Sequence, residues 1–154
     1  MRNSVDVHNF LQERSVPHEL VPVRGRFRSA DRIAAVLGLE PEQVGKVVIL
    51  GASRGLVAVL VPSNREPDLR RVAVAVPTPT LRELSTDEVT DATDFLAEAV
   101  PPAGLPDGTR TIMDHGLAEQ EVLYFSGGEG STLLKIRPED LRGAIEAKVA
   151  KVTR

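Results

Sequence analysis

The chain has 154 residues, 42% of them hydrophobic and 27% charged, which is enough for one globular domain with its own core over residues 1–154. Its net charge of −3 argues against a broad basic surface for nucleic acid. The absence of cysteine excludes disulfides, thiol nucleophiles and cysteine-based zinc sites, and it fits a cytoplasmic protein. No apolar run is long enough to span a membrane, so no membrane is expected among its partners.

The first predicted elements are a helix and a strand. Ser4 can cap a helix that runs to about Arg14, since Pro17 follows shortly after it. Residues 18–23 alternate between apolar and polar side chains, which predicts a strand.

A helix followed by a hairpin is predicted next. Ser29 can cap a short amphipathic helix that ends at Gly38, a residue type suited to a helix end. The apolar runs 46–50 and 56–61 predict two core strands, joined by a turn at 53–55.

Lys46 is the one charged residue at the start of this apolar hairpin. An ammonium there either reaches water as a polar strand end or points into a pocket as a fixed cation. Residue chemistry alone favours the first alternative.

The middle of the chain is predicted as helix, helix and loop. Residues 67–76 favour a helix that begins at a proline, although 72–76 would also suit a strand. Ser85 or Thr86 can cap the next helix, because acidic residues follow in its first turn. The density of proline and glycine over residues 94–108 predicts a long surface loop.

The last third of the chain is predicted as sheet followed by helix. Three strands are expected, at residues 109–113, 121–125 and 132–136. A glycine-rich turn at 126–131 would join the last two, and Pro138 begins a helix whose apolar face carries Leu141, Ile145 and Val149. Strands that pair locally as hairpins, with helices between them, predict a mixed α/β or α+β domain and not a doubly wound parallel sheet.

Motifs for bound cofactors and metals are absent from the sequence. The pair Gly45-Lys46 is similar to the end of a phosphate-binding P-loop, but Glu40 replaces its first glycine and Val47 replaces its magnesium-binding hydroxyl. The three histidines are too widely spaced to form a metal-binding motif. No cofactor or metal site is therefore predicted.

Lys46, the glycine turn and the proline-rich loop remain as candidate site elements. Glycines let backbone N–H groups approach an oxyanion closely. A lysine facing such a turn would stabilise the charge that develops on an ester carbonyl under attack.

Basic residues gather in three short segments. Each segment is expected to be solvated surface, because the sequence cannot show that the segments converge. Recognition of the end of a nucleic acid would need only a few of these side chains. The segments contain Arg24, Arg26 and Arg28; Arg65, Arg70 and Arg71; and Lys148, Lys151 and Arg154.

An ordered set of short segments resembles the YbaK/EbsC family of aminoacyl-tRNA deacylases, which is related to the editing domain associated with prolyl-tRNA synthetase. The resemblance covers about residues 18–142. The matching segments are 28–39, 44–49, 61–62, 100–105, 112–114, 126–128 and 138–141.

The resemblance implies a single domain with a partly barrel-like mixed sheet, surrounding helices and a pocket for the aminoacylated 3′ end of a tRNA. It implies hydrolysis of a mischarged ester in trans, without a metal, with tRNA-Pro carrying a small amino acid as the expected substrate and a synthetase as a further candidate partner. Water, or a group on the substrate, would attack the ester.

The resemblance also assigns residues. Lys46 falls on the family's functional lysine, which would hold the terminal phosphate or the carbonyl. The substrate-binding positions are Thr93, Val100, Pro101, Pro102, Asp114, Gly127 and Gly128.

The sequence departs from the family at two positions near this pocket. Thr93 keeps the threonine of a threonine-glycine pair, but Asp94 replaces its glycine and Glu98 replaces a second glycine. These side chains would change backbone angles or fill the pocket, and their carboxylates would repel a phosphate. Alternatively, an acidic residue meets the α-ammonium of the substrate. The departures leave a second function open, a non-catalytic aminoacyl- or nucleotide-binding module or a synthetase-associated module of the same fold.

Overall fold

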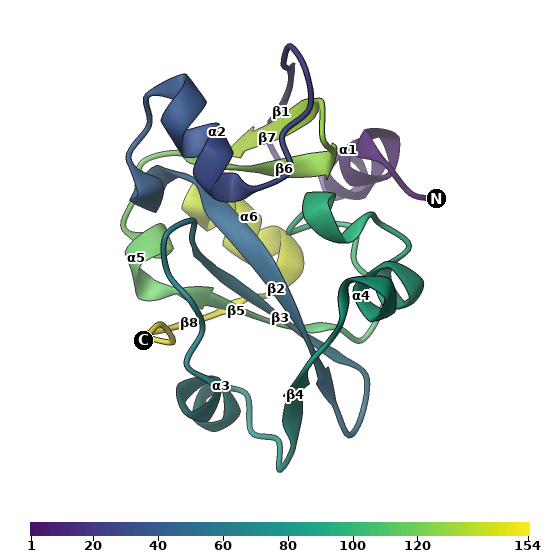
Figure 1. Cartoon of the computed structure of the whole chain (residues 1–154), viewed down its shortest axis with the longest axis vertical. Coiled ribbons are helices and arrows are strands. Elements are labelled where there is room, and N and C mark those ends of the chain that lie inside the picture. Colours follow the sequence, from purple (N-terminus) through teal and green to yellow (C-terminus); the bar gives the residue numbers. More distant parts are fainter.

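Eight strands form two sheets in this computed structural model, which describes residues 1–154 (Figure 1). The helices are α1 (Ser4–Glu13), α2 (Ala30–Leu37), α3 (Leu69–Ala75), α4 (Thr86–Thr93), α5 (His115–Ala118) and α6 (Pro138–Ile145), with short 3-10 turns η1 (Pro41–Gln43) and η2 (Ala97–Ala99). The strands are β1 (Glu19–Pro22), β2 (Gly45–Ala52), β3 (Leu56–Pro62), β4 (Leu81–Glu83), β5 (Arg110–Asp114), β6 (Leu123–Glu129), β7 (Thr132–Ile136) and β8 (Lys148–Ala150).

The β2–β3 hairpin is the centre of the larger sheet, as its apolar sequence predicts. This sheet has the order β4-β2-β3-β5-β8, with β2 antiparallel to β3 and β4, and with β3, β5 and β8 parallel to one another. All of β3 except its first residue is buried, because both faces of the sheet are covered.

The smaller sheet has the antiparallel order β1-β7-β6 and packs against one face of the larger sheet. An isolated parallel bridge between Val44 and Tyr124 joins the two sheets at one point. The mixed α/β fold class is confirmed. The two sheets remain separate and form no closed barrel.

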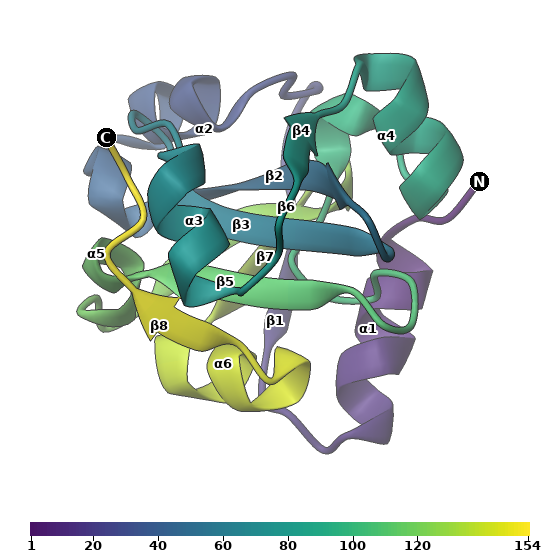
Figure 2. The ribbon, with the colours of Figure 1, turned by 90° about the horizontal axis from the view of Figure 1, so that it is seen from below.

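Two apolar layers hold the larger sheet. The main core lies between the sheets, where Leu60 of β3 and Phe125 of β6 meet Leu11 of α1. On the opposite face, α3 packs Val72 against Val59, and Figure 2 shows this helix lying across the sheet. The core is built from aliphatic side chains with only two fully buried phenylalanines.

Of the two helices predicted in the N-terminal part of the chain, the first needs an adjustment. The first helix is capped by Asn3 and not by Ser4, because the Asn3 side chain accepts the Val5 N–H and Asp6 completes a capping box. The second helix is as predicted, with Ser29 as N-cap and Gly38 in the left-handed conformation at its end.

Three predictions in the second half of the chain are wrong in whole or in part. Residues 94–108 form a loop apart from η2, as predicted, but this loop is not on the surface, because Phe95 and all residues from 99 to 104 are buried. The glycine-rich turn at 126–131 is in large part strand: β6 continues to Glu129 through a register shift. Val149 belongs to β8 and not to the last helix, which ends at Ile145.

The helices are short. The longest, α1, has ten residues, so no helix of the structure has the length and apolar character to cross a membrane.

Candidate functional site

Lys46 is the second residue of β2, where the hairpin register places it opposite Val61. Its side chain is 26% exposed, and Nζ donates a hydrogen bond of 2.6 Å to Oε1 of Glu66, whose side chain is 60% exposed. Because β3 runs back along β2, the segment after Pro62 returns to the level of Lys46. The ammonium of Lys46 is therefore partly desolvated, whereas the carboxylate of Glu66 is largely exposed to solvent. Because an exposed ion pair is weak, an anionic ligand can displace Glu66 from Lys46.

A cavity of about 200 Å³ opens beside Lys46. It is bounded by α2 and the loop before it, the start of β2, η2, and the facing parts of β6 and β7. Its apolar lining consists of Phe27, Ala30, Ile33, Val47, Ala97, Val100 and Leu133. Its polar lining consists of Arg28, Ser29, Lys46, Glu98, Ser126, Glu129 and Thr132.

The two serine hydroxyls in the cavity are not paired with a general base. The Ser29 hydroxyl caps α2, and the Ser126 hydroxyl donates to the Ala99 carbonyl at 2.8 Å. The Thr132 hydroxyl donates to the carboxylate of Glu129 at 3.3 Å, and no histidine lines the cavity. A covalent mechanism needs a nucleophile with an adjacent base, and Thr132 with Glu129 is the one such pair in the lining.

An ion pair joins two walls of the cavity. Glu98 on η2 lines the cavity and binds Arg26, in the loop before α2, at 2.6 Å. The stem of Arg26 lies against Gly130, where a Cβ would overlap it. The ion pair therefore ties the loop before α2 to η2 beside the cavity.

Glu129 is a second carboxylate in the lining. Its Oε2 accepts the backbone N–H of Ser4 at 3.1 Å, and Oε1 accepts the Thr132 hydroxyl. The hydrogen bond from the Ser4 backbone lowers the pKa of Glu129 below its ordinary value, with a smaller contribution from the Ser4 hydroxyl, while burial opposes the shift. Glu129 is ionised at neutral pH and ties α1 to the wall of the cavity.

We expect Glu129→Gln to lower Tm by about 2 °C at pH 7, because a charged acceptor is replaced by a neutral one. The folded-state pKa lies below the unfolded value of about 4.5, so the stabilisation is complete above that value and is lost as the pH falls through the folded-state pKa. Thermal unfolding of the wild-type protein and of Glu129→Gln between pH 7 and pH 3 measures how the difference in Tm depends on pH. A difference in Tm that grows on acidification would contradict the assignment.

The sequence of residues 26–144 matches the family described as the aminoacyl-tRNA editing domain. This range contains every residue that lines the cavity. The chain belongs to the aminoacyl-tRNA editing domain family. The resemblance in the sequence is thereby confirmed.

Members and structural neighbours of the editing family agree with this assignment. EbsC of Enterococcus faecalis, named as a proposed Cys-tRNA(Pro)/Cys-tRNA(Cys) deacylase, is 22% identical over 126 residues, or 81% of this chain and 77% of its own length. The crystal structure of the hypothetical protein APE2540 has a TM-score of 0.90 at 25% identity, covering 97% of this chain and 99% of that one. A proposed trans-editing enzyme for prolyl tRNA synthetase has a TM-score of 0.86 at 25% identity, covering 98% and 96%.

The structure brings some of the predicted editing residues together at the cavity. Lys46 and Val100 line it, whereas Pro101 is buried behind it. Pro102 lines a different cavity. Thr93 is buried, and its hydroxyl donates to the Val89 carbonyl at 2.8 Å, which holds the end of α4.

Other predicted editing residues lie next to the cavity or away from it. Gly127 and Gly128 do not line it, although their neighbours Ser126 and Glu129 do. Gly128 has φ of 104°, and a Cβ there would press on the start of α1. Asp114 is 5% exposed and accepts two backbone N–H groups at 3.0 Å, from α5 and from the C-terminal segment.

The two departures from the family differ in consequence. Asp94 ends α4 in the left-handed conformation with φ of 63°, which explains why a glycine is suited to this position. Its carboxylate lies 4.0 Å from the N-terminal ammonium and does not line the cavity. Only Glu98 adds a carboxylate to the lining.

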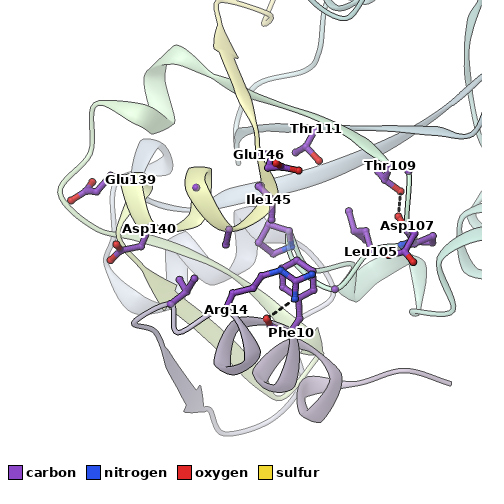
Figure 3. Close-up of a pocket in the computed structure, with 17 residues that line it drawn as sticks. Phe10, Arg14, Leu105, Asp107, Thr109, Thr111, Glu139, Asp140, Ile145 and Glu146 are labelled. Carbon is purple, nitrogen blue, oxygen red and sulfur yellow. Dashed lines mark hydrogen bonds between the residues drawn. The ribbon is translucent and has the colours of Figure 1, made fainter.

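A larger cavity of about 640 Å³ lies elsewhere, between α1, α6 and residues 102–111 (Figure 3). Its one cation, Arg14, stacks over the Phe10 ring at 3.6 Å and donates to the Phe10 carbonyl. The four carboxylates in its lining would repel a phosphate or an oxyanion, so the smaller cavity is the better candidate site for an anionic ligand. They belong to Asp107, Glu139, Asp140 and Glu146.

Sequence reasoning missed several residues of this site. Glu66 is twenty positions from Lys46, and the antiparallel hairpin was the signal that could have placed it there. Ile33 and Leu133 lie in a predicted helix and a predicted strand, and no pattern in the sequence indicates that they line a cavity. No three His, Asp or Glu side chains lie together in a way that could hold a metal ion.

Proposed function

We propose that this chain is a trans-acting deacylase that hydrolyses the ester of a mischarged tRNA, with tRNA-Pro carrying a small amino acid as its substrate. The observation that carries the proposal is a partly buried ammonium, Lys46, in a small cavity. Membership in the editing family supports the proposal, as does the similarity to EbsC and to the proposed trans-editing enzyme for prolyl tRNA synthetase.

The size of the cavity supports a small amino acid. A volume of about 200 Å³ lies below the range of about 300–1,000 Å³ typical of sites for drug-sized ligands. Val100 and Leu133 form part of the apolar wall of this cavity, and such a wall suits a short apolar or weakly polar side chain. We infer alanine, serine or cysteine as the residue removed.

In the proposed reaction a water oxygen attacks the carbonyl carbon of the ester. Lys46 donates to the carbonyl oxygen and stabilises the negative charge that develops there. The bond from that carbon to the ribose oxygen then breaks, and that oxygen takes up the proton that the attacking water has lost and becomes a hydroxyl. The products are the free amino acid and tRNA with an intact 3′ end.

The test is deacylation of tRNA-Pro carrying alanine, serine or cysteine, with correctly charged prolyl-tRNA as the comparison. We expect release of one small amino acid at a rate at least ten times that of proline, because a pocket that fits poorly costs about 1.4 kcal/mol or more. Binding of these substrates without release of any of them would instead support the non-catalytic module. The Arg26–Glu98 ion pair, which joins two walls of the cavity, is the observation that favours that second function.

Substitutions of Glu98 distinguish two effects of its carboxylate: binding of the α-ammonium of the substrate and obstruction of the cavity. If its carboxylate meets the α-ammonium of the substrate, we expect Glu98→Gln to raise KM by roughly three- to tenfold with little change in kcat, because a charged hydrogen bond is lost in ground state and transition state alike. Arg26→Ala is the matched control, since it breaks the same ion pair and keeps the carboxylate. An increase in deacylation by Glu98→Gly would show that Glu98 obstructs the cavity instead.

A further inference from the structure

Two of the three basic segments of the sequence come together in the fold. The segment that leads into α3 lies against the C-terminal residues: the Asp68 N–H donates to the Val152 carbonyl at 2.7 Å, and Pro67 forms a bridge with Thr153. Figures 1 and 2 both show α3, β8 and the C-terminus side by side. Residues that are about eighty positions apart therefore form one surface.

Six exposed cations cover this surface, which we call the C-terminal basic surface. They are Arg65, Arg70, Arg71, Lys148, Lys151 and Arg154. The carboxylate of Asp68 binds Arg71 at 3.7 Å, and the terminal carboxylate of Arg154 is also present. The surface remains net positive in a protein whose net charge is −3, so the charge of the molecule is strongly asymmetric.

Main-chain oxygens hold three of these cations in place. Arg65 donates to a terminal carboxylate oxygen of Arg154 at 3.3 Å, and Arg71 donates to the Thr153 carbonyl at 3.0 Å. Lys148 donates to the carbonyl of Ala75 in α3 at 2.8 Å. The cations are thus fixed by the fold before any partner arrives.

The C-terminal basic surface reaches the Lys46 cavity through one residue. Glu66 binds Lys46 through its side chain at 2.6 Å and accepts the Arg154 N–H through its carbonyl at 3.0 Å. The Arg154 guanidinium donates to the carbonyl of the next residue, Pro67, at 3.3 Å. A ligand whose end occupies the cavity and whose body is a polyanion would lie along this surface.

We propose that the C-terminal basic surface binds the phosphate backbone of the tRNA acceptor stem while the 3′ end enters the Lys46 cavity. Contacts to phosphates fix the position and orientation of a nucleic acid without reading its sequence. Val74, which is 79% exposed on α3 beside Arg70 and Arg71, gives an apolar contact for the sugars of the shallow RNA minor groove. This proposal rests on the proposed deacylase function.

Arg70→Ala/Lys151→Ala tests the surface, because neither side chain takes part in the hydrogen bonds that hold the fold. The matched control is Arg54→Ala/Arg142→Ala, which also removes two exposed cations, one at the far turn of the hairpin and one on α6. Binding of uncharged tRNA is measured by fluorescence anisotropy at several concentrations of KCl. We expect a Kd several-fold higher for the first variant only, and a slope of log Kd against log salt reduced by between one and two.

Equal losses of tRNA binding in both variants, or none in either, would overturn the proposal. Hydrolysis keeps this result separate from the proposed function: the ratio of kcat/KM for whole aminoacyl-tRNA to that for an aminoacylated CCA fragment should fall in Arg70→Ala/Lys151→Ala. If the protein is an active deacylase and this ratio is the same in the variant and the wild type, the C-terminal basic surface is not a docking site for tRNA. Binding of tRNA through this surface, with no hydrolysis of any substrate, would overturn the deacylase and leave the docking surface in place.

Discussion

Replacing Lys46 by alanine should lower kcat/KM for deacylation by about 10²- to 10³-fold, the effect of removing one donor to a developing oxyanion. The fold should be unaffected, because the lysine makes a single ion pair with a largely exposed carboxylate, and such pairs contribute little. The first effect is measured from initial rates with whichever of the alanyl-, seryl- or cysteinyl-tRNA-Pro substrates the wild-type protein hydrolyses. The second is measured as the Tm of each protein.

Glu66→Gln is the control for this experiment, since it removes the partner of Lys46 and keeps the ammonium. If the ammonium of Lys46 itself is required, kcat/KM for deacylation should fall less than tenfold in Glu66→Gln. Equal losses in the two variants would show that the ion pair, and not the ammonium alone, is needed. Full activity of folded Lys46→Ala would remove Lys46 from the mechanism.

Gly45→Ala should have the largest effect on stability, because Gly45 lies directly against Phe125. A Cβ at this position would overlap the Phe125 ring, which is fully buried between the sheets and has no solvent to move into. Overpacking of this kind costs about 3 kcal/mol, which corresponds to a fall in Tm of about 6–12 °C in a domain of this length. Gly45 also lines the cavity, so deacylation should fall as well.

Gly143→Ala is the matched control for this change. Gly143 lies in α6 with no atom within 4 Å of an added Cβ, so alanine should stabilise the protein by about 0.5–1 kcal/mol. Phe125→Leu in the Gly45→Ala background should recover part of the lost stability by making space. Thermal unfolding of the three variants is the measurement, and an unchanged Tm in Gly45→Ala would contradict the packing described here.

Elements set by local sequence were predictable. The β2–β3 hairpin was evident because both strands are apolar and a short turn joins them, and α2 was evident because Ser29 and Gly38 mark its ends. Both depend on neighbouring residues only. The mixed fold class followed from these elements.

Elements that depend on distant contacts were not predictable from the same patterns. β8 is three residues long and exists because β5 lies beside it, so nothing in its own sequence distinguishes it from the end of a helix. The burial of Phe95 depends on packing against α1 and the two sheets. The convergence of two basic segments depends on Val152 and Thr153 lying along the start of α3.

At the candidate site, too, the residues in recognisable segments were predictable and the contacts between distant residues were not. The family resemblance supplied Lys46 and Val100, which the structure places at one cavity, because both positions belong to recognisable segments. It gave no reason to expect the pairing of Glu98 with Arg26, since that contact joins residues seventy-two positions apart. Glu98 is a departure from the family, and its partner could be found only in three dimensions.

The bridge between Val44 and Tyr124 has a practical consequence for all of these experiments. Tyr124 is the only tyrosine and there is no tryptophan, so intrinsic fluorescence excited near 280 nm reports on one residue. That residue stands where the two sheets meet and packs in the same apolar cluster as Ile33 and Leu133 of the cavity wall. A single optical signal can therefore follow unfolding and the filling of the cavity in the unlabelled protein.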